Sequence, residues 1–156
     1  MIQLDTTILL RFAKSSDPAY PVVDAALTAL VIRGHVPVVV PQNVYEFWTA
    51  ATRPVANNGL GMSIPECQRQ VARLKRLFHF LPDRPGLFDE WENLVGTYAC
   101  SGKVAHDARL VAAMQTHGIK HLMTLNVRDF ARYPGITVID PTTVMPPSTP
   151  PTPGTP

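Results

Sequence analysis

Apolar residues recur along this chain in two patterns, short continuous runs and longer stretches with three- and four-residue spacing. The runs predict strands and cover residues 2–4, 36–40, 78–81, 119–125 and 136–139. The spaced stretches predict helices and cover residues 8–12, 20–33, 41–51, 63–77, 86–99 and 106–117. Because strand and helix alternate, we expect a three-layer α/β/α fold with a central parallel sheet.

Residues at the ends of these segments support the predicted boundaries. Pro41 follows the second run and suits the first turn of a helix. Ser63 and Glu66 have the spacing of a capping box, in which Ser63 accepts from the backbone N–H of Glu66 and the Glu66 side chain reaches back. Residues 53–62 predict a loop, and residues 126–129 predict a turn between the last two strands.

The end of the chain differs in composition from the rest. Residues 141–156 hold seven of the sixteen prolines and no charged residue. Such a segment cannot bury enough apolar surface to offset the entropy of ordering it, so we expect a proline-rich disordered tail. Residues 1–140 have the size of one compact domain.

Composition narrows the class of protein. With 46% hydrophobic and 17% charged residues, the chain is typical of neither a disordered nor a membrane-spanning protein. The opening MIQLDTT has no basic segment followed by an apolar one, so we expect no secretory signal and a cytoplasmic protein. Cys67 and Cys100 stand far apart and are expected to be free thiols. The net charge of +2 does not by itself indicate a nucleic-acid-binding protein.

Three acidic residues are expected at one edge of the predicted sheet. Asp5 follows the first strand, Glu46 lies about one turn into the helix after the second, and Asp129 follows the fourth. Open parallel sheets bind ligands beyond the carboxyl ends of their strands, so these acids would converge there. Asp107 lies at the start of the predicted helix before the fourth strand, and sequence geometry leaves open whether it points to the same crevice.

Converging carboxylates repel one another unless a cation neutralises them. Oxygen ligands without His or Cys favour Mg²⁺ or Mn²⁺, which keeps positions for water and phosphate. This pattern predicts metal-dependent phosphate chemistry. Each acid also has a simpler alternative: Asp5 and Asp107 would cap their helices, and Glu46 and Asp129 would be solvated surface residues.

Four segments resemble a known family. They are LDTTILLRFA, PQNVYEFWTAATRP, HDARLVAAM and TLNVRDFARYPGITVID, in this order along the chain. Their order and spacing are similar to those of PIN-domain ribonucleases, and within these to VapC-type toxins of type II toxin–antitoxin systems. The resemblance covers residues 1–140.

The resemblance implies a metal-dependent endoribonuclease that uses Mg²⁺ or Mn²⁺ and leaves a 3′-hydroxyl and a 5′-phosphate. It also implies an RNA substrate, a homodimer and a small antitoxin protein whose tail occupies the acidic groove. It assigns catalytic and metal-binding roles to four acids and supporting roles to two neighbours: Asp5, Glu46, Asp107 and Asp129, with Asn126 and Thr124.

Two positions depart from the usual pattern of the family. Thr7 stands where members usually have Asn, and Asn126 stands where many have an acid. A hydroxyl offers fewer hydrogen bonds than an amide, so Thr7 is expected to loosen the site. The alternative function is a catalytically weakened PIN-like module that binds RNA or a partner protein without cleaving. A phosphatase is disfavoured, because Thr7 stands where its motif needs a second Asp.

Basic residues provide candidates for RNA contact. Arg69, Arg73 and Arg76 recur at helical spacing and predict a positive stripe that suits a phosphate backbone. A solvated helix face is the alternative for this stripe. Arg11 and Arg53 lie near the acidic motifs in the sequence and are further candidates.

Overall fold

Five short strands pair into one parallel sheet in the computed structural model, which describes residues 1–144. Along the chain they are β1 (Ile2–Leu4), β2 (Pro37–Val39), β3 (His79–Phe80), β4 (His121–Met123) and β5 (Thr137–Ile139). Their order in space is β3-β2-β1-β4-β5. In register, Ile2 of the central strand stands opposite Pro37 on one side and His121 on the other.

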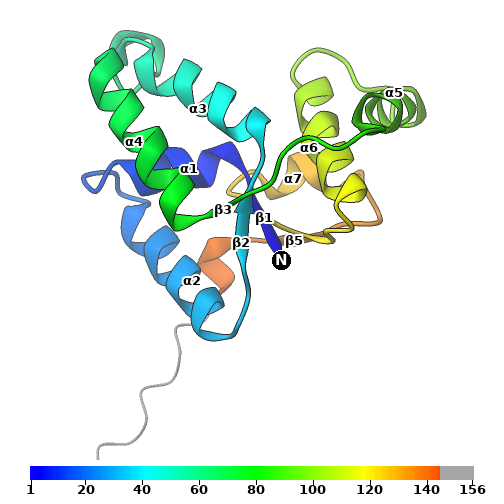
Figure 1. Cartoon of the computed structure of the whole chain (residues 1–156), viewed down its shortest axis with the longest axis horizontal. Coiled ribbons are helices and arrows are strands. Elements are labelled where there is room, and N and C mark those ends of the chain that lie inside the picture. Colours follow the sequence, from blue (N-terminus) through cyan, green and yellow to red (C-terminus); the bar gives the residue numbers. More distant parts are fainter. Residues whose placement is uncertain (145–156) are drawn as a thin grey trace, which may run out of the picture.

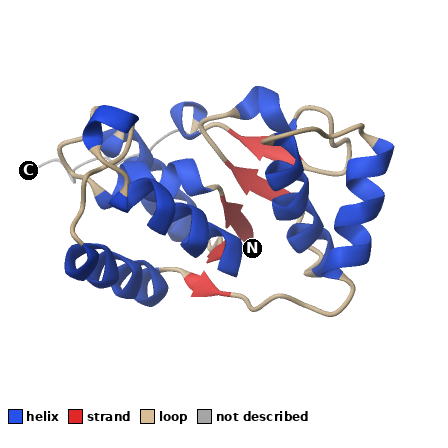
Figure 2. Cartoon of the chain, turned by 90° about the horizontal axis from the view of Figure 1, so that it is seen from above, coloured by secondary structure: helices blue, strands red, loops and turns tan. Residues whose placement is uncertain are grey.

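Helices cover both faces of this sheet, as Figure 1 and Figure 2 show. The first four α-helices lie on one side: α1 (Thr6–Ala13), α2 (Tyr20–Ile32), α3 (Pro41–Thr52) and α4 (Ile64–Leu77). The other side holds α5 (Leu87–Thr97), α6 (Val104–Thr116) and the short α7 (Val127–Phe130). The predicted α/β/α class with a central parallel sheet is therefore confirmed.

Each face of the sheet has its own hydrophobic core. Strand residues alternate between the two cores, because successive side chains of a strand point to opposite faces. Val39 packs in one core with Leu9 and Phe47. Its neighbour Val38 packs in the other core with Leu110. Helices α3 and α6 consequently pack in different layers.

Two predicted helix starts are present. α3 begins at Pro41, and the side chain of Asn43 accepts a hydrogen bond from the backbone N–H of Val40 at 2.9 Å. α4 begins after Ser63, whose Oγ accepts from the backbone N–H of Glu66 at 3.4 Å. Only half of the predicted capping box forms, because within residues 1–144 the Glu66 side chain makes no return bond to Ser63.

Two predicted segments differ from the structure. Residues 126–129 are predicted as a turn, but they belong largely to α7, which Phe130 anchors in the core. The tail is predicted to begin at residue 141, but Pro141–Thr143 forms a 3₁₀ turn, η2, that packs against α2 and buries Pro141. Regular structure thus extends past the predicted domain end at residue 140. The rest of the predicted tail, residues 145–156, lies outside the described residues.

Two further sequence predictions concern the whole described chain. None of the helices in residues 1–144 combines the length and hydropathy needed to cross a membrane. Cys67 and Cys100 are free thiols, as predicted.

Candidate active site

The strand order reverses at β1, which has β2 on one side and β4 on the other. In open parallel sheets this kind of reversal opens a crevice at the carboxyl ends of the strands. Asp5 directly follows β1, and Thr124 directly follows β4. Both residues are buried, and they meet at this edge of the sheet through a hydrogen bond of 2.6 Å from Thr124 Oγ1 to Asp5 Oδ2.

Two hydroxyls hold the Asp5 carboxylate. Thr7 Oγ1 also donates to Asp5 Oδ2 at 2.6 Å, while Thr124 Oγ1 accepts from the backbone N–H of Asn126 at 2.9 Å. Asp5 stands directly before α1, but its side chain makes no capping bond. The alternative in which Asp5 merely caps a helix is therefore wrong. No hydrogen bond from residues 1–144 reaches Asp5 Oδ1, which leaves this oxygen available to a ligand.

Both oxygens of the Glu46 carboxylate accept hydrogen bonds. Thr6 Oγ1 donates to Oε2 at 2.8 Å, and Gln42 Nε2 donates to Oε1 at 2.7 Å. His106 Nδ1 lies 4.0 Å from the same Oε1. Because Thr6 begins α1 and Glu46 lies in the second turn of α3, these contacts join the two helices beside Asp5.

Asp107 is the fourth residue of α6, too far into the helix to cap it. The pKa of its half-buried carboxyl is raised to about 6. Burial is the largest cause, followed by the negative charges of Asp129, Asp5 and Glu46, while Arg132 acts in the opposite direction. The other three predicted acids therefore lie close enough to Asp107 to influence its ionisation.

Asp129 and Asn126 lie at α7, just after β4. Both are exposed, and together with Asp140 they help to line a cavity of about 360 Å³. Arg128 adjoins Asp129 in the sequence, but in the described chain the two form no ion pair.

The donor atoms of the site suit a hard divalent cation. They are carboxylate, hydroxyl and amide oxygens, and the crowding that raises the pKa of Asp107 would be relieved by positive charge. Among residues 1–144, however, no three His, Cys, Asp or Glu side chains form an arrangement that could hold a metal ion by themselves. Water would have to complete the coordination, as is usual for Mg²⁺. The Mg²⁺ or Mn²⁺ expected from the sequence stays a prediction.

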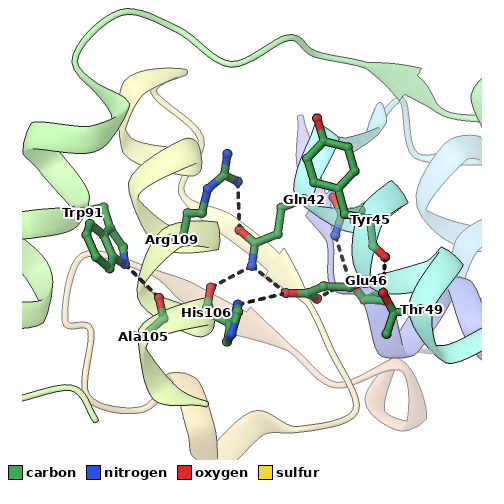
Figure 3. A network of polar contacts seen from close by, with 10 residues as sticks. Gln42, Tyr45, Glu46, Thr49, Trp91, Ala105, His106 and Arg109 are labelled. Carbon is green, nitrogen blue, oxygen red and sulfur yellow. Dashed lines mark hydrogen bonds and ion pairs between the residues drawn. The ribbon is translucent and has the colours of Figure 1, made fainter. Parts of the chain in front are cut away.

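A groove of about 610 Å³ adjoins Glu46 and Asp107, between α3 and α6. Among the arginines predicted to contact RNA, Arg53 lines this groove, whereas Arg11 forms an ion pair with Asp17 at 2.9 Å. The other lining residues, several of which Figure 3 shows, are Gln42, Tyr45, Thr49, Lys103, His106 and Arg109.

The predicted positive stripe lies on α4, away from the residues that line the groove. Arg69 and Arg76 are exposed there. Arg73 is half-buried, and its guanidinium lies 5.0 Å from the ring centroid of Phe12. Arg73 therefore covers an aromatic ring of the core and is not simply part of a solvated face.

Gln42 is a part of the site that the sequence analysis does not identify. It lies one helical turn before Glu46, a spacing that places two residues on the same helix face and could have suggested the contact. Its amide oxygen accepts from Arg109 Nη1 at 3.2 Å, and Arg109 Nη2 pairs with Asp83 at 2.7 Å. No local pattern could have revealed these two contacts, because they join residues far apart in the sequence.

No protein-family model and no curated protein matches this chain. Solved structures match its fold. A toxin–antitoxin complex from Klebsiella pneumoniae is 22% identical with a TM-score of 0.60, over 90% of this chain and 98% of that one. VapC20 from Mycobacterium tuberculosis, described as a sarcin-ricin loop cleaving toxin, is 18% identical with a TM-score of 0.57, over 78% and 87%. VapBC2 from Rickettsia felis, bound to a promoter DNA fragment, is 12% identical with a TM-score of 0.67, over 89% and 98%.

At these identities the likeness concerns the fold. The matches extend over most of this chain and most of each matched chain, so they compare whole domains. They confirm at the level of the fold the resemblance seen in the sequence: this chain has the PIN-type α/β/α fold of VapC-type toxin structures.

Proposed function

We propose that this chain is a metal-dependent endoribonuclease and the toxin of a toxin–antitoxin pair. The observation that supports this most directly is the group of acids at one edge of the sheet, where the half-buried Asp107 lies near Asp5, Glu46 and Asp129, because a divalent cation would neutralise their charge. The position of this site, at the carboxyl ends of parallel strands, suits ligand binding. The fold shared with VapC20, a toxin described as cleaving the sarcin-ricin loop, supports RNA as the substrate.

The proposed ligands of Mg²⁺ or Mn²⁺ are the four acids Asp5, Glu46, Asp107 and Asp129. When bound, the cation would activate water for in-line attack on an RNA phosphodiester and stabilise the leaving oxygen. Crowded carboxylates of this kind bind a cation more readily than isolated ones, because binding relieves their mutual repulsion.

The neutral side chains around these acids prepare them for this role. Thr7 and Thr124 orient the Asp5 carboxylate, and Thr6 orients that of Glu46, in each case without neutralising the charge. Arg53, in the wall of the adjoining groove, would attract the RNA backbone. The chain would thus orient its acids before a substrate arrives.

An antitoxin protein is the proposed partner of this nuclease. The match to a toxin–antitoxin complex from Klebsiella pneumoniae supports it. A homodimer is also part of the proposal, by analogy with the family that the sequence resembles.

Cleavage of end-labelled total RNA by the purified protein tests the proposed function. We expect discrete fragments with Mn²⁺, none with EDTA, and none from Asp5→Asn, which removes one proposed ligand charge while keeping the size of the side chain. Glu92→Gln removes a charge from the exposed face of α5 and should cleave like the wild type.

Full activity of a folded Asp5→Asn protein would exclude Asp5 as a metal ligand. A well-folded wild-type protein that binds Mn²⁺ but cuts no RNA would favour the alternative, a PIN-like module that binds RNA or a partner protein without cleaving.

A further inference from the structure

The Gln42 side chain lies between its own helix, α3, which also carries Glu46, and α6, which carries Asp107. Gln42 is the second residue of α3, and it is only 5% exposed. Figure 3 shows its side chain between those of Glu46 and Arg109, close to the backbone of His106. A buried amide must find partners for its two N–H donors and its carbonyl oxygen, because unpaired polar groups are destabilising inside a protein.

Every polar group of this amide has a partner. Nε2 donates to Glu46 Oε1 at 2.7 Å and to the backbone oxygen of His106 at 2.8 Å. Oε1 accepts from Arg109 Nη1 at 3.2 Å. Reversing the amide would set its oxygen against two acceptors and its NH₂ group against a guanidinium. The surroundings therefore allow only one orientation.

Arg109 is itself held in place. Its Nη2 pairs at 2.7 Å with Oδ2 of Asp83, which lies between β3 and α5. Hydrogen bonds therefore connect Asp83 to Glu46 through Arg109 and Gln42. Asp83 lies in a loop, and Glu46 is a proposed metal ligand. The orientation of the Glu46 carboxylate therefore depends in part on residues outside the acidic site.

Glu46 and Asp107 are carried by helices in different layers of the fold. Phe47, next to Glu46, packs in one core, and Ala108, next to Asp107, packs in the other. Gln42 bridges these layers, because it bonds both to Glu46 and to the backbone of the residue before Asp107.

We propose that Gln42 is a positioning residue that holds Glu46 in the orientation needed to bind a divalent cation together with Asp107. This inference rests on the proposed function, since it concerns the proposed metal site. Gln42 acts through Glu46 and does not itself bind the ion. Removing a residue that orients a metal ligand typically weakens metal binding about 10- to 100-fold, and we expect about 10-fold here.

Titration of the full-length protein with Mn²⁺ alone, followed by calorimetry, tests this role without RNA. Gln42→Met keeps a similar side-chain volume but removes both donors, so its Kd for Mn²⁺ should rise about 10-fold. Gln70→Met on α4 is the matched control, because the Gln70 Oε1 is buried without a partner in the described chain. Its Kd should equal that of the wild type. Thermal unfolding in EDTA establishes that each variant is folded before metal is added.

Arg109→Lys provides a second variant in case Gln42→Met does not fold. Lys keeps the positive charge but lacks the fork that reaches Gln42 and Asp83 together. We expect a smaller rise of the Kd for Mn²⁺ in the same direction.

The outcomes separate this inference from the proposed function. The proposed metal site stands if the wild type binds Mn²⁺ and Asp5→Asn does not. The positioning role is nevertheless overturned if Gln42→Met then binds Mn²⁺ like the wild type. Where Gln42→Met is unfolded, Arg109→Lys takes its place in this comparison. A folded wild type that binds no Mn²⁺ would overturn the metal site and the role of Gln42 together.

Discussion

At the scale of single residues, the candidate site uses neutral donors to orient charged acceptors. The Asp5 carboxylate accepts two hydroxyl hydrogen bonds, and the Glu46 carboxylate accepts one hydroxyl and one amide bond. Neutral donors fix the orientation of a carboxylate but leave its negative charge in place. Asp107 differs, because burial and the neighbouring acids raise its pKa.

Asp107→Asn should stabilise the metal-free protein at neutral pH. The pKa of Asp107 is raised from 3.8 to about 6, so the folded state binds its proton more tightly than the unfolded state. This favourable contribution is present below about pH 4 and is lost as the pH rises through about 6. Since the side chain is partly exposed, we expect a gain of about 1 kcal/mol in the free energy of unfolding at pH 7.5 in EDTA.

Urea denaturation at pH 7.5 and at pH 4 would measure this gain. It should be largely lost at the lower pH, where the Asp107 carboxyl is protonated in the folded wild type and, with its ordinary pKa of 3.8, partly protonated in the unfolded state. Glu92→Gln, which removes an exposed charge from α5, should show no comparable dependence on pH. An equal gain for Asp107→Asn at both values would mean that the ionisation of Asp107 does not cause it.

The sequence places Asp5 and Glu46 correctly at the carboxyl edge of the sheet but does not settle what their side chains do. An Asp before a helix is a common cap. Only the observed hydrogen bonds from Thr7 and Thr124 show that the Asp5 carboxylate contacts these hydroxyls and does not cap the helix. Gln42 is missed because two of its partners, His106 and Arg109, lie on α6, far from it in the sequence.

At the scale of elements, the loop after α3 folds back on the end of that helix. Gly61 N–H donates to the backbone oxygen of Arg53 at 2.9 Å, and Met62 N–H donates to that of Ala51 at 2.8 Å. The backbone of Gly59 lies so close to that of Arg53 that an added Cβ would lie 1.9 Å from the Arg53 backbone oxygen. A side chain at residue 59 must therefore displace backbone next to the groove.

Gly59→Ala should lower the free energy of unfolding by about 2 kcal/mol or more, because the loop must move or strain to accept a methyl group. Gly96→Ala is the matched control, since residue 96 lies inside α5 with open space around it. There the same change should raise stability by about 0.5–1 kcal/mol through helix propensity. Urea denaturation of both variants measures the two effects. Equal stability of Gly59→Ala and the wild type would exclude the close approach of Gly59 to the Arg53 backbone.

Element types follow from the sequence more reliably than element ends. Helices such as α2 and α4 have long periodic patterns and appear close to the predicted ranges. In contrast, α7 is only four residues long and is stabilised by burial of Phe130 in a distant core, so it has no periodicity of its own. η2 is missed for a related reason, because Pro141 is buried against α2 although its local sequence resembles that of the tail.

At the scale of the whole molecule, two regions offer positive charge that could bind RNA. Arg53 and Lys103 lie in the groove beside Glu46 and Asp107. Arg69 and Arg76 lie exposed on α4, which packs against α3 and β3. The net charge of +2 does not show which of these regions binds RNA. Measuring RNA binding by a variant of each region would show it.

Arg53→Ala should weaken RNA binding and reduce its salt dependence. When an RNA phosphate binds Arg53, the counterions around that phosphate are released. Each such contact contributes about 0.7 to the slope of log K against log salt for a single strand. We therefore expect the slope to fall by about 0.7 for Arg53→Ala. Arg69→Ala removes the same charge from α4 and should leave the slope unchanged. Fluorescence anisotropy with labelled RNA, in an Asp5→Asn background that prevents cleavage, measures both slopes. A larger reduction for Arg69→Ala would instead identify the α4 stripe as the main RNA-binding surface, because the slope counts phosphate contacts wherever they occur.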